Sequence, residues 1–197
     1  RVFRKHAGCR IWPPRSLLMD DPPYRSVKKA GFDLSYIFSG KIDLNELALR
    51  VVEECVPEVS VYITDPDEFW QERLKKDFSE IPGVIVSVHN GSVHVGDAVR
   101  NLAPDIVVMN WLDTLPPNFI RRYAKDPIGL KIAVLSRIPE RDIIRQRPDV
   151  DFVLSKSAPV EALTLVVKYW TEQIQARKRD ELREGLLKNQ RQASRSS

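Results

Sequence analysis

The sequence is short of cysteine and of long apolar runs, and both shortages exclude classes of protein. Its 197 residues include only two cysteines, Cys9 and Cys55, which lie far apart. This predicts reduced thiols rather than a disulfide framework or a zinc site. No stretch approaches the roughly 18 consecutive apolar residues that a membrane span needs. The basic start, residues 1–6, is not followed by an apolar segment. We therefore expect no secretory signal and a cytoplasmic protein.

Motifs that mark common enzymes are also missing. The chain has eight glycines and three histidines, and it contains no P-loop, Ser-His-Asp arrangement or paired zinc-ligand motif. His89 and His94 are close in sequence, but no cysteine or third histidine lies near them. Surface histidines are therefore a better interpretation than a metal site. We expect no enzyme activity, no cofactor and no bound metal.

The sequence does have enough apolar residues for a core, together with an uneven distribution of charge. Hydrophobic residues make up 43% of the chain, which suits one ordinary domain with additional elements. Residues 1–30 carry eight Lys/Arg and two Asp, and residues 171–197 carry seven basic and four acidic residues. The body between them is acidic. Basic ends suit an acidic partner or a nucleic-acid backbone, so nucleic-acid contact stays open, although no DNA-binding motif is visible.

Strand patterns and helix patterns alternate regularly from residue 58 onward. Strands are expected at 59–64, 84–88, 106–109, 131–135 and 152–154, and helices at 67–79, 95–102, 117–125, 140–146 and after Pro159. Five strands separated by helices predict a doubly wound parallel sheet with right-handed crossovers. The third strand has four consecutive apolar residues, which predicts cover on both faces. It delivers Asn110 to its C-terminal end, where ligands bind in open α/β sheets.

The segments on either side of this body are less regular. Residues 1–40 are irregular but rich in apolar residues, and we expect an arm that packs on another surface. Asp43 and Glu46 have the spacing of a capping box that opens a helix ending before Pro57. The last helix is expected to continue beyond Trp170, followed by a disordered tail from Gln190. The predicted division is an arm and helix at 1–57, a body at 58–170 and a C-terminal extension at 171–197.

Four stretches, in this order and spacing, resemble the receiver domain of two-component response regulators. They are 62–70, 103–110, 131–136 and 152–156, within a region of about 59–170. The resemblance implies a flavodoxin-like (CheY-like) α/β fold with strand order 2-1-3-4-5. It also implies a phosphorylation site at the strand ends. In that family two neighbouring acids hold Mg²⁺, an Asp accepts the phosphoryl group, and a Ser or Thr and a Lys bind its oxygens.

The residues of that family site are only partly present here. Asp65 fits the first acid, but Pro66 stands where the second is expected, and Asn110 occupies the acceptor position as an amide. Ser136 and Lys156 match their positions. An amide oxygen is not the carboxylate nucleophile that acyl phosphate formation needs. A single carboxylate must also compete with water for an ion that dehydrates reluctantly.

Two further departures concern the last strand and its loop. Ser157 follows Lys156, where the family usually has proline, and Val153 stands at the position of the family's switch aromatic. Phe152 is one place off and should face the other side of the strand. The sequence therefore resembles a pseudoreceiver, in which the scaffold is retained and phosphotransfer is lost.

The same site residues also have purely structural interpretations. Lys156 can pair with Asp65, and Asn110 can hydrogen-bond nearby backbone, because a buried amide must find partners. Asp67 suits a helix N-cap. Ser136 has no independent interpretation. These alternatives stay open from sequence alone.

The function that follows is a signalling or transcription-regulating interaction module that does not depend on phosphorylation. Its expected partners are a regulatory protein or a second copy. The predicted contact residues lie on the last helix, and they are Trp170, Ile174, Arg177, Lys178 and Arg179. The alternative is a macro-type domain that binds or hydrolyses ADP-ribose, because residues 93–97 and 105–110 are similar to that family's Gly-Asp element and Asn-ending strand. That family's second asparagine and glycine-rich loop are absent here.

Overall fold

The computed structural model describes residues 44–89, 95–111 and 116–193. These residues fall into two units, one spanning Glu58–Ile174 and the other holding helix α3 (Leu44–Glu54) and the part of the last helix from Gln175 onward. Several predictions lie outside the described residues. They concern the N-terminal arm, the capping residue Asp43, Cys9 and His94.

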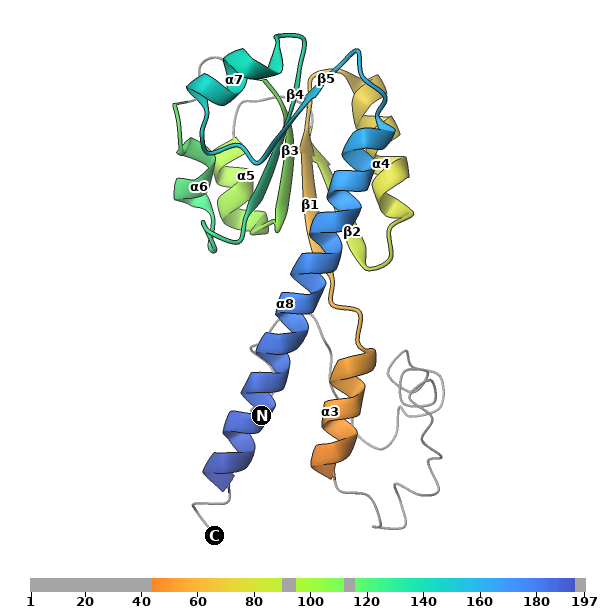
Figure 1. The fold of residues 1–197 in the computed structure, drawn as a ribbon, viewed down its shortest axis with the longest axis vertical. Coiled ribbons are helices and arrows are strands. Elements are labelled where there is room, and N and C mark those ends of the chain that lie inside the picture. The colour runs from red at the N-terminus through yellow and green to blue at the C-terminus, as the bar shows by residue number, and fades with distance from the viewer. Residues whose placement is uncertain (1–43, 90–94, 112–115, 194–197) are drawn as a thin grey trace. The chain divides into compact units, whose positions relative to one another are not determined.

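The larger unit is built on a five-stranded parallel sheet (Figure 1). Its strands are β1 (Val59–Thr64), β2 (Val84–His89), β3 (Ile106–Asn110), β4 (Lys131–Ser136) and β5 (Phe152–Ser155). Their order is β2-β1-β3-β4-β5, and every neighbouring pair is parallel. The predicted fold class and strand order are therefore confirmed.

Helices cover both faces of this sheet (Figure 1). They are α4 (Glu68–Ser79), α5 (Val95–Leu102), α6 (Phe119–Tyr123), α7 (Glu140–Gln146) and α8 (Glu161–Ala193). One core lies between the sheet and helices α4 and α8, and a second lies between the sheet and helices α5, α6 and α7. Helix α6 is shorter than the predicted 117–125, because Asn118 adopts a left-handed backbone (φ 60°) and Ala124 is extended.

Strand β3 lies at the centre of the fold, as its unbroken apolar sequence predicts. Ile106 and Val108 belong to the core beneath α4 and α8, while Val107 and Met109 belong to the opposite core. All four are at most 1% exposed. A strand buried on both faces carries its first polar side chain, Asn110, to the edge of the sheet.

Helix α8 differs from its prediction in two respects. It remains helical to Ala193, so the disordered tail predicted from Gln190 is wrong for residues 190–193. Trp170 and Ile174, predicted to contact a partner, are only 7% and 4% exposed within the core. The Trp170 ring packs edge-on against Phe152, with centroids 6.5 Å apart. These two side chains hold the domain together and are not a partner surface.

Membrane insertion finds no support in the described helices, since none combines the length and apolar character that a membrane span needs.

Candidate functional site

The C-terminal edge of the sheet gathers the predicted site residues. Asp65 follows β1, Asn110 ends β3, Ser136 ends β4 and Lys156 follows β5. These strands are neighbours in the order β1-β3-β4-β5, so their ends meet at one edge. Backbone bonds hold the edge together, with Lys156 N donating to Ser136 O at 2.7 Å.

Asp65 and Lys156 form a closed ion pair at this edge. The Lys156 Nζ lies 2.9 Å from Asp65 Oδ1 and 2.7 Å from Oδ2. The side chain of Asp65 is fully buried and that of Lys156 is 9% exposed. The Lys156 Nζ also lies 5.8 Å from the centre of the Trp70 ring. Of the interpretations that the sequence leaves open for Lys156, the structure shows the pairing with Asp65.

The surrounding backbone fixes Asp65 further. The Asp67 N–H donates to Asp65 Oδ1 at 2.9 Å, and the Gln71 side-chain amide donates to the Asp65 carbonyl. Gln71 is a buried polar residue of α4. Sequence reasoning missed this contact, because nothing in the pattern of a helix shows that one glutamine reaches back to the preceding turn.

The positions beside Asp65 supply no second metal-binding acid. Pro66 is exposed and has no carboxylate. The next acid, Asp67, is the N-cap of α4, and its side chain accepts from Phe69 N at 3.1 Å. The predicted capping role of Asp67 is therefore confirmed.

Asn110 and Ser136 both bond to nearby backbone. The Asn110 Nδ2 donates to Trp111 O at 3.2 Å, as predicted. The Ser136 hydroxyl oxygen accepts from Ile138 N at 2.9 Å, and the side chain is buried. This is a serine turn that shapes the loop after β4, and it was not predicted from the sequence.

Phe152 and Val153 of β5, the strand that precedes Lys156, face opposite sides of the sheet, as predicted. Val153 packs in the core beside α5, α6 and α7, whereas Phe152 packs against the opposite core. The core around Val153 also holds Tyr62, which is 2% exposed. Burial raises the pKa of the Tyr62 phenol, and a hydrogen bond with Thr64 partly offsets that rise. The side chain that β5 turns toward this core is therefore a valine and not an aromatic residue.

Metal-binding clusters are not found among the described residues, where no three His, Cys, Asp or Glu side chains gather. His89 is exposed and its ring lies 6.1 Å from that of Tyr62. Cys55 is half-buried.

The Gly-Asp element that suggested a macro-type domain serves another purpose here. Gly96 and Asp97 lie within α5. A Cβ added at Gly96 would lie 2.9 Å from Tyr123 Cε2, so this glycine lets α5 and α6 approach closely. Asp97 is exposed and pairs with Arg100 at 3.6 Å. The macro-type interpretation finds no support in this arrangement.

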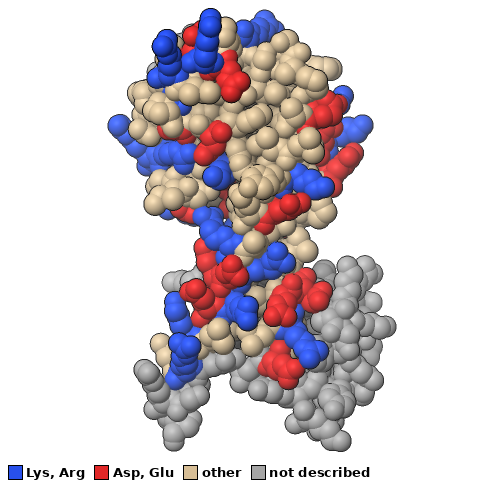
Figure 2. Space-filling view, viewed as in Figure 1, with Lys and Arg blue, Asp and Glu red and all other residues tan. Residues whose placement is uncertain are grey.

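The basic residues of the last helix do not form a continuous basic surface within the described chain. Arg177 pairs with Glu181 at 3.8 Å, and Asp180 lies between them in sequence. Figure 2 shows acidic and basic side chains intermixed along this part of α8. The arrangement gives no specific support to a nucleic-acid interface.

A buried ion pair lies away from the site, and sequence reasoning did not anticipate it. The Arg147 Nε and Nη2 donate to Asp149 Oδ1 and Oδ2, both at 2.8 Å, and the two side chains are 2% and 0% exposed. Burial acts to raise the pKa of Asp149, but the hydrogen bonds and charge of Arg147 outweigh it and lower that pKa.

The sheet order and this edge define the class of fold, which is that of receiver domains. No family model matches the sequence, and no curated protein matches it. Among solved structures, the receiver domain of the Francisella response regulator 1452 is 18% identical, covers 59% of this chain and 99% of its own, and has a TM-score of 0.50. The receiver domain of NarL from Mycobacterium tuberculosis is 15% identical, with coverages of 58% and 97% and a TM-score of 0.49. The first likeness agrees with the flavodoxin-like, CheY-like topology derived from the strands.

Proposed function

We propose that this chain is a regulatory protein-interaction module that uses a receiver fold without phosphorylation. The observation that carries the proposal is the closed pair of Asp65 and Lys156. Both carboxylate oxygens lie within ion-pair distance of one ammonium group, and the pair is almost fully buried. Asp65 is the carboxylate that would bind a metal ion in a phosphorylation site, and the ammonium group of Lys156 already neutralises its charge.

Binding of Mg²⁺ is disfavoured by this arrangement. The ion needs near-octahedral oxygen ligands at about 2.0–2.1 Å and gives up its waters reluctantly. Here Asp65 is the lone acid at the expected ligand positions, since Pro66 has no carboxylate and Asn110 is neutral. A metal ion would have to displace Lys156 from a buried carboxylate, which removes a favourable Coulomb interaction in a poorly solvated place.

Phosphoryl transfer also lacks its nucleophile. The family forms an acyl phosphate on a carboxylate oxygen at the end of the third strand. Asn110 offers an amide there, and its nitrogen donates to Trp111 O. An amide oxygen carries no formal charge and does not form the acyl phosphate at a useful rate.

A role in binding another protein requires an exposed surface that the partner can contact. Leu165 and Tyr169 of α8 are 68% and 58% exposed. They are four residues apart, so they lie next to each other on one face of the helix. Exposed apolar side chains that gather on one face suit a protein contact. This pair, rather than Trp170 and Ile174, is the surface that we propose for a regulatory partner.

Incubation with acetyl phosphate and Mg²⁺ tests the proposal. We expect the intact mass of the wild-type chain to stay unchanged, because no carboxylate occupies position 110. The matched variant combines Asn110→Asp with Pro66→Asp and restores the missing acids on the same scaffold. A phosphoryl adduct on the variant alone would support the proposal, and a stoichiometric adduct on the wild type would refute it.

A further inference from the structure

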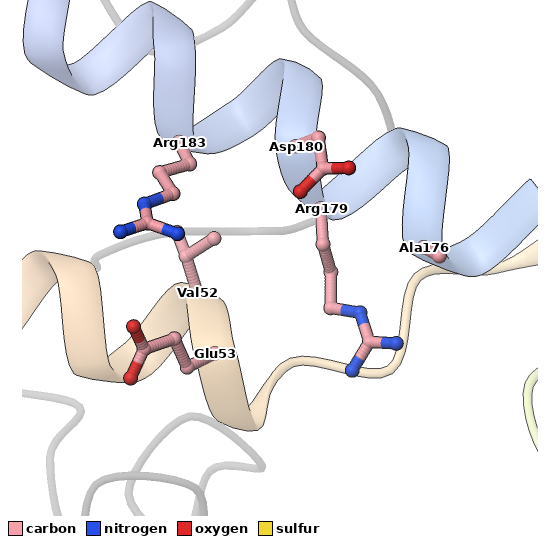
Figure 3. Close-up of a pocket in the computed structure, with 6 residues that line it drawn as sticks. All are labelled: Val52, Glu53, Ala176, Arg179, Asp180 and Arg183. Atoms are coloured by element: carbon pink, nitrogen blue, oxygen red, sulfur yellow. The ribbon is translucent and has the colours of Figure 1, made fainter.

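The cavity of the second unit carries mixed charges. It has a volume of about 210 Å³ and lies between α3 and the last part of α8 (Figure 3). Its lining residues are Val52, Glu53, Ala176, Arg179, Asp180 and Arg183. Because two acids and two arginines balance each other there, the cavity selects neither an anion nor a cation. The larger unit has a better-defined binding surface at one edge of its sheet.

Strand β2 forms this edge and lacks the features that usually protect an edge strand. Among the described residues it pairs only with β1 (Figure 1). Its sequence, Val-Ile-Val-Ser-Val-His, has no charged residue and no proline, whereas natural edge strands are commonly blunted by lysine, proline or a bulge. Ile85 is 48% exposed. The other edge strand, β5, is shorter and lies between the charged residues Asp151 and Lys156.

The backbone groups of β2 point alternately toward β1 and toward the open side. Val59 of β1 is the register partner of Val84, and its N–H donates to Gly83 O at 2.8 Å. A residue in a parallel ladder bonds to the two residues that flank its register partner. The odd-numbered residues of β2 therefore bond to β1. The residues that direct their N–H and C=O groups to the open side are Val84, Val86 and Val88.

Most of these outward groups have no protein partner within the described residues. Val84 N donates to Ile81 O at 3.2 Å, but no turn, loop or cap hydrogen bond of the described chain uses Val86 or Val88. Regularly spaced N–H and C=O groups along an extended edge are a template for another strand. The partner that fits is therefore a strand with few charges.

The strand β2 of a second copy meets this requirement in the antiparallel direction. Two identical edges cannot pair parallel and in register, because a parallel ladder sets each outward-bonding residue opposite one that bonds away. An antiparallel pair with a two-fold axis at Val86 has no such conflict. Val86 exchanges both its bonds with Val86 of the other copy, and Val88 N–H donates to the C=O of Val84. This two-fold contact is closed.

The side chains of β2 suit the same register. Its valines pack against the core beneath α4 and α8, and the axis sets Val84 beside Val88 of the other copy on that face. Ile85 projects from the opposite face of the strand and meets Ser87 of the other copy. No like charges face each other, and an apolar side chain that is half exposed gains a neighbour.

We propose that two copies of this chain join along β2, antiparallel about Val86, so that their sheets continue as one. The contact is separate from the Asp65 site and from the surface of Leu165 and Tyr169. It therefore goes beyond the proposed function, and either proposal can fail without the other.

Disulfide trapping in a background of Cys9→Ser and Cys55→Ser tests the register. Residues opposite each other in a non-hydrogen-bonded antiparallel pair have Cα atoms about 4.5 Å apart, within the 4.4–6.8 Å or so that a disulfide spans. Ile85 of one copy stands opposite Ser87 of the other, whereas two copies of either residue are diagonal neighbours about 7–8 Å apart. We expect Ile85→Cys and Ser87→Cys, mixed before mild oxidation, to form a covalent dimer that contains one of each. Either variant alone should remain largely monomeric. No mixed dimer, or equal trapping in each variant alone, would overturn the proposal.

Sedimentation equilibrium of the full chain provides the second readout. We expect a concentration-dependent dimer whose dissociation constant rises at least about ten-fold in Ile85→Lys, because the two-fold axis makes the change count twice and places lysine on the edge. The matched control is Ile128→Lys, which alters an isoleucine that is 93% exposed in the turn before β4 and should leave the constant unchanged. A monomer at all concentrations, or a dimer that both variants weaken equally, would contradict pairing along β2.

Discussion

Replacing Lys156 by methionine is expected to lower the free energy of unfolding by about 3 kcal/mol, because breaking a buried ion pair leaves a charge without compensation. The charge in question is the carboxylate of Asp65, whose side chain is fully buried. Urea unfolding at neutral pH, followed by tryptophan fluorescence, measures the change. The exposed residue Lys75 supplies the matched control, since surface substitutions usually stay within about 0.5 kcal/mol.

Two companion measurements show whether the pair acts as a unit. Adding Asp65→Asn to Lys156→Met removes the buried charge and should recover much of the lost stability. Excess Mg²⁺ should not stabilise the Lys156→Met variant, because the second acid is still missing. A variant as stable as the wild type, or one that Mg²⁺ restores, would argue that Asp65 belongs to a metal site.

Arg147→Met is expected to have an effect of similar size, about 3 kcal/mol or more, for the same physical reason. It removes a two-pronged contact in which both distances are 2.8 Å and leaves Asp149 enclosed without a cation. Thermal or urea unfolding detects the loss. The exposed Arg145, in the last turn of α7 just before Arg147, gives a control, Arg145→Met, that should be close to neutral.

The effect of Arg147→Met should depend on pH in a defined direction. The pKa of Asp149 is lowered in the folded chain, so its contribution to stability is present above the unfolded value of about 3.9 and is lost as pH falls through the lower folded value. The difference in unfolding free energy between the wild type and Arg147→Met should therefore shrink in acid. A difference that stays constant from neutral pH to about pH 3 would contradict this assignment.

The sheet could be predicted from sequence because its signals are local and strong. Ile106 to Met109 form an unbroken apolar run, and such a run predicts a strand that is covered on both faces. The alternation of strands and helices then fixed a parallel sheet. The one-residue offset between Phe152 and Val153 also placed the aromatic ring correctly, since side chains alternate between faces along a strand.

The errors come from features that depend on tertiary packing. Trp170 was predicted as a contact residue because the last helix was expected to continue beyond it, yet Phe152 and the sheet cover it. Tyr169, one residue earlier, is the exposed aromatic. Periodicity identifies an apolar face, but it does not show which part of that face the rest of the domain covers.

The sequence predicted which residues lie at the candidate site, but it did not predict all the hydrogen bonds that hold them. The resemblance placed Asp65 and Lys156 at one edge of the sheet, and their opposite charges made an ion pair one of the interpretations that stayed open. The contact of Gln71 and the turn at Ser136 depend on loop backbone geometry, which leaves no pattern in the sequence. The pairing of Arg147 with Asp149 was missed for the same reason, because two charged residues around a proline read as a solvated loop.

Binding of beryllofluoride in the presence of Mg²⁺ tests the central claim most directly, because this complex imitates a phosphoryl group on an acceptor carboxylate. Fluorine NMR of the wild-type chain is predicted to show only the signals of free fluoride species, since Lys156 already neutralises Asp65 and Asn110 offers no carboxylate. A saturable bound fluorine signal that requires Mg²⁺ and disappears in Asp65→Asn would contradict the account.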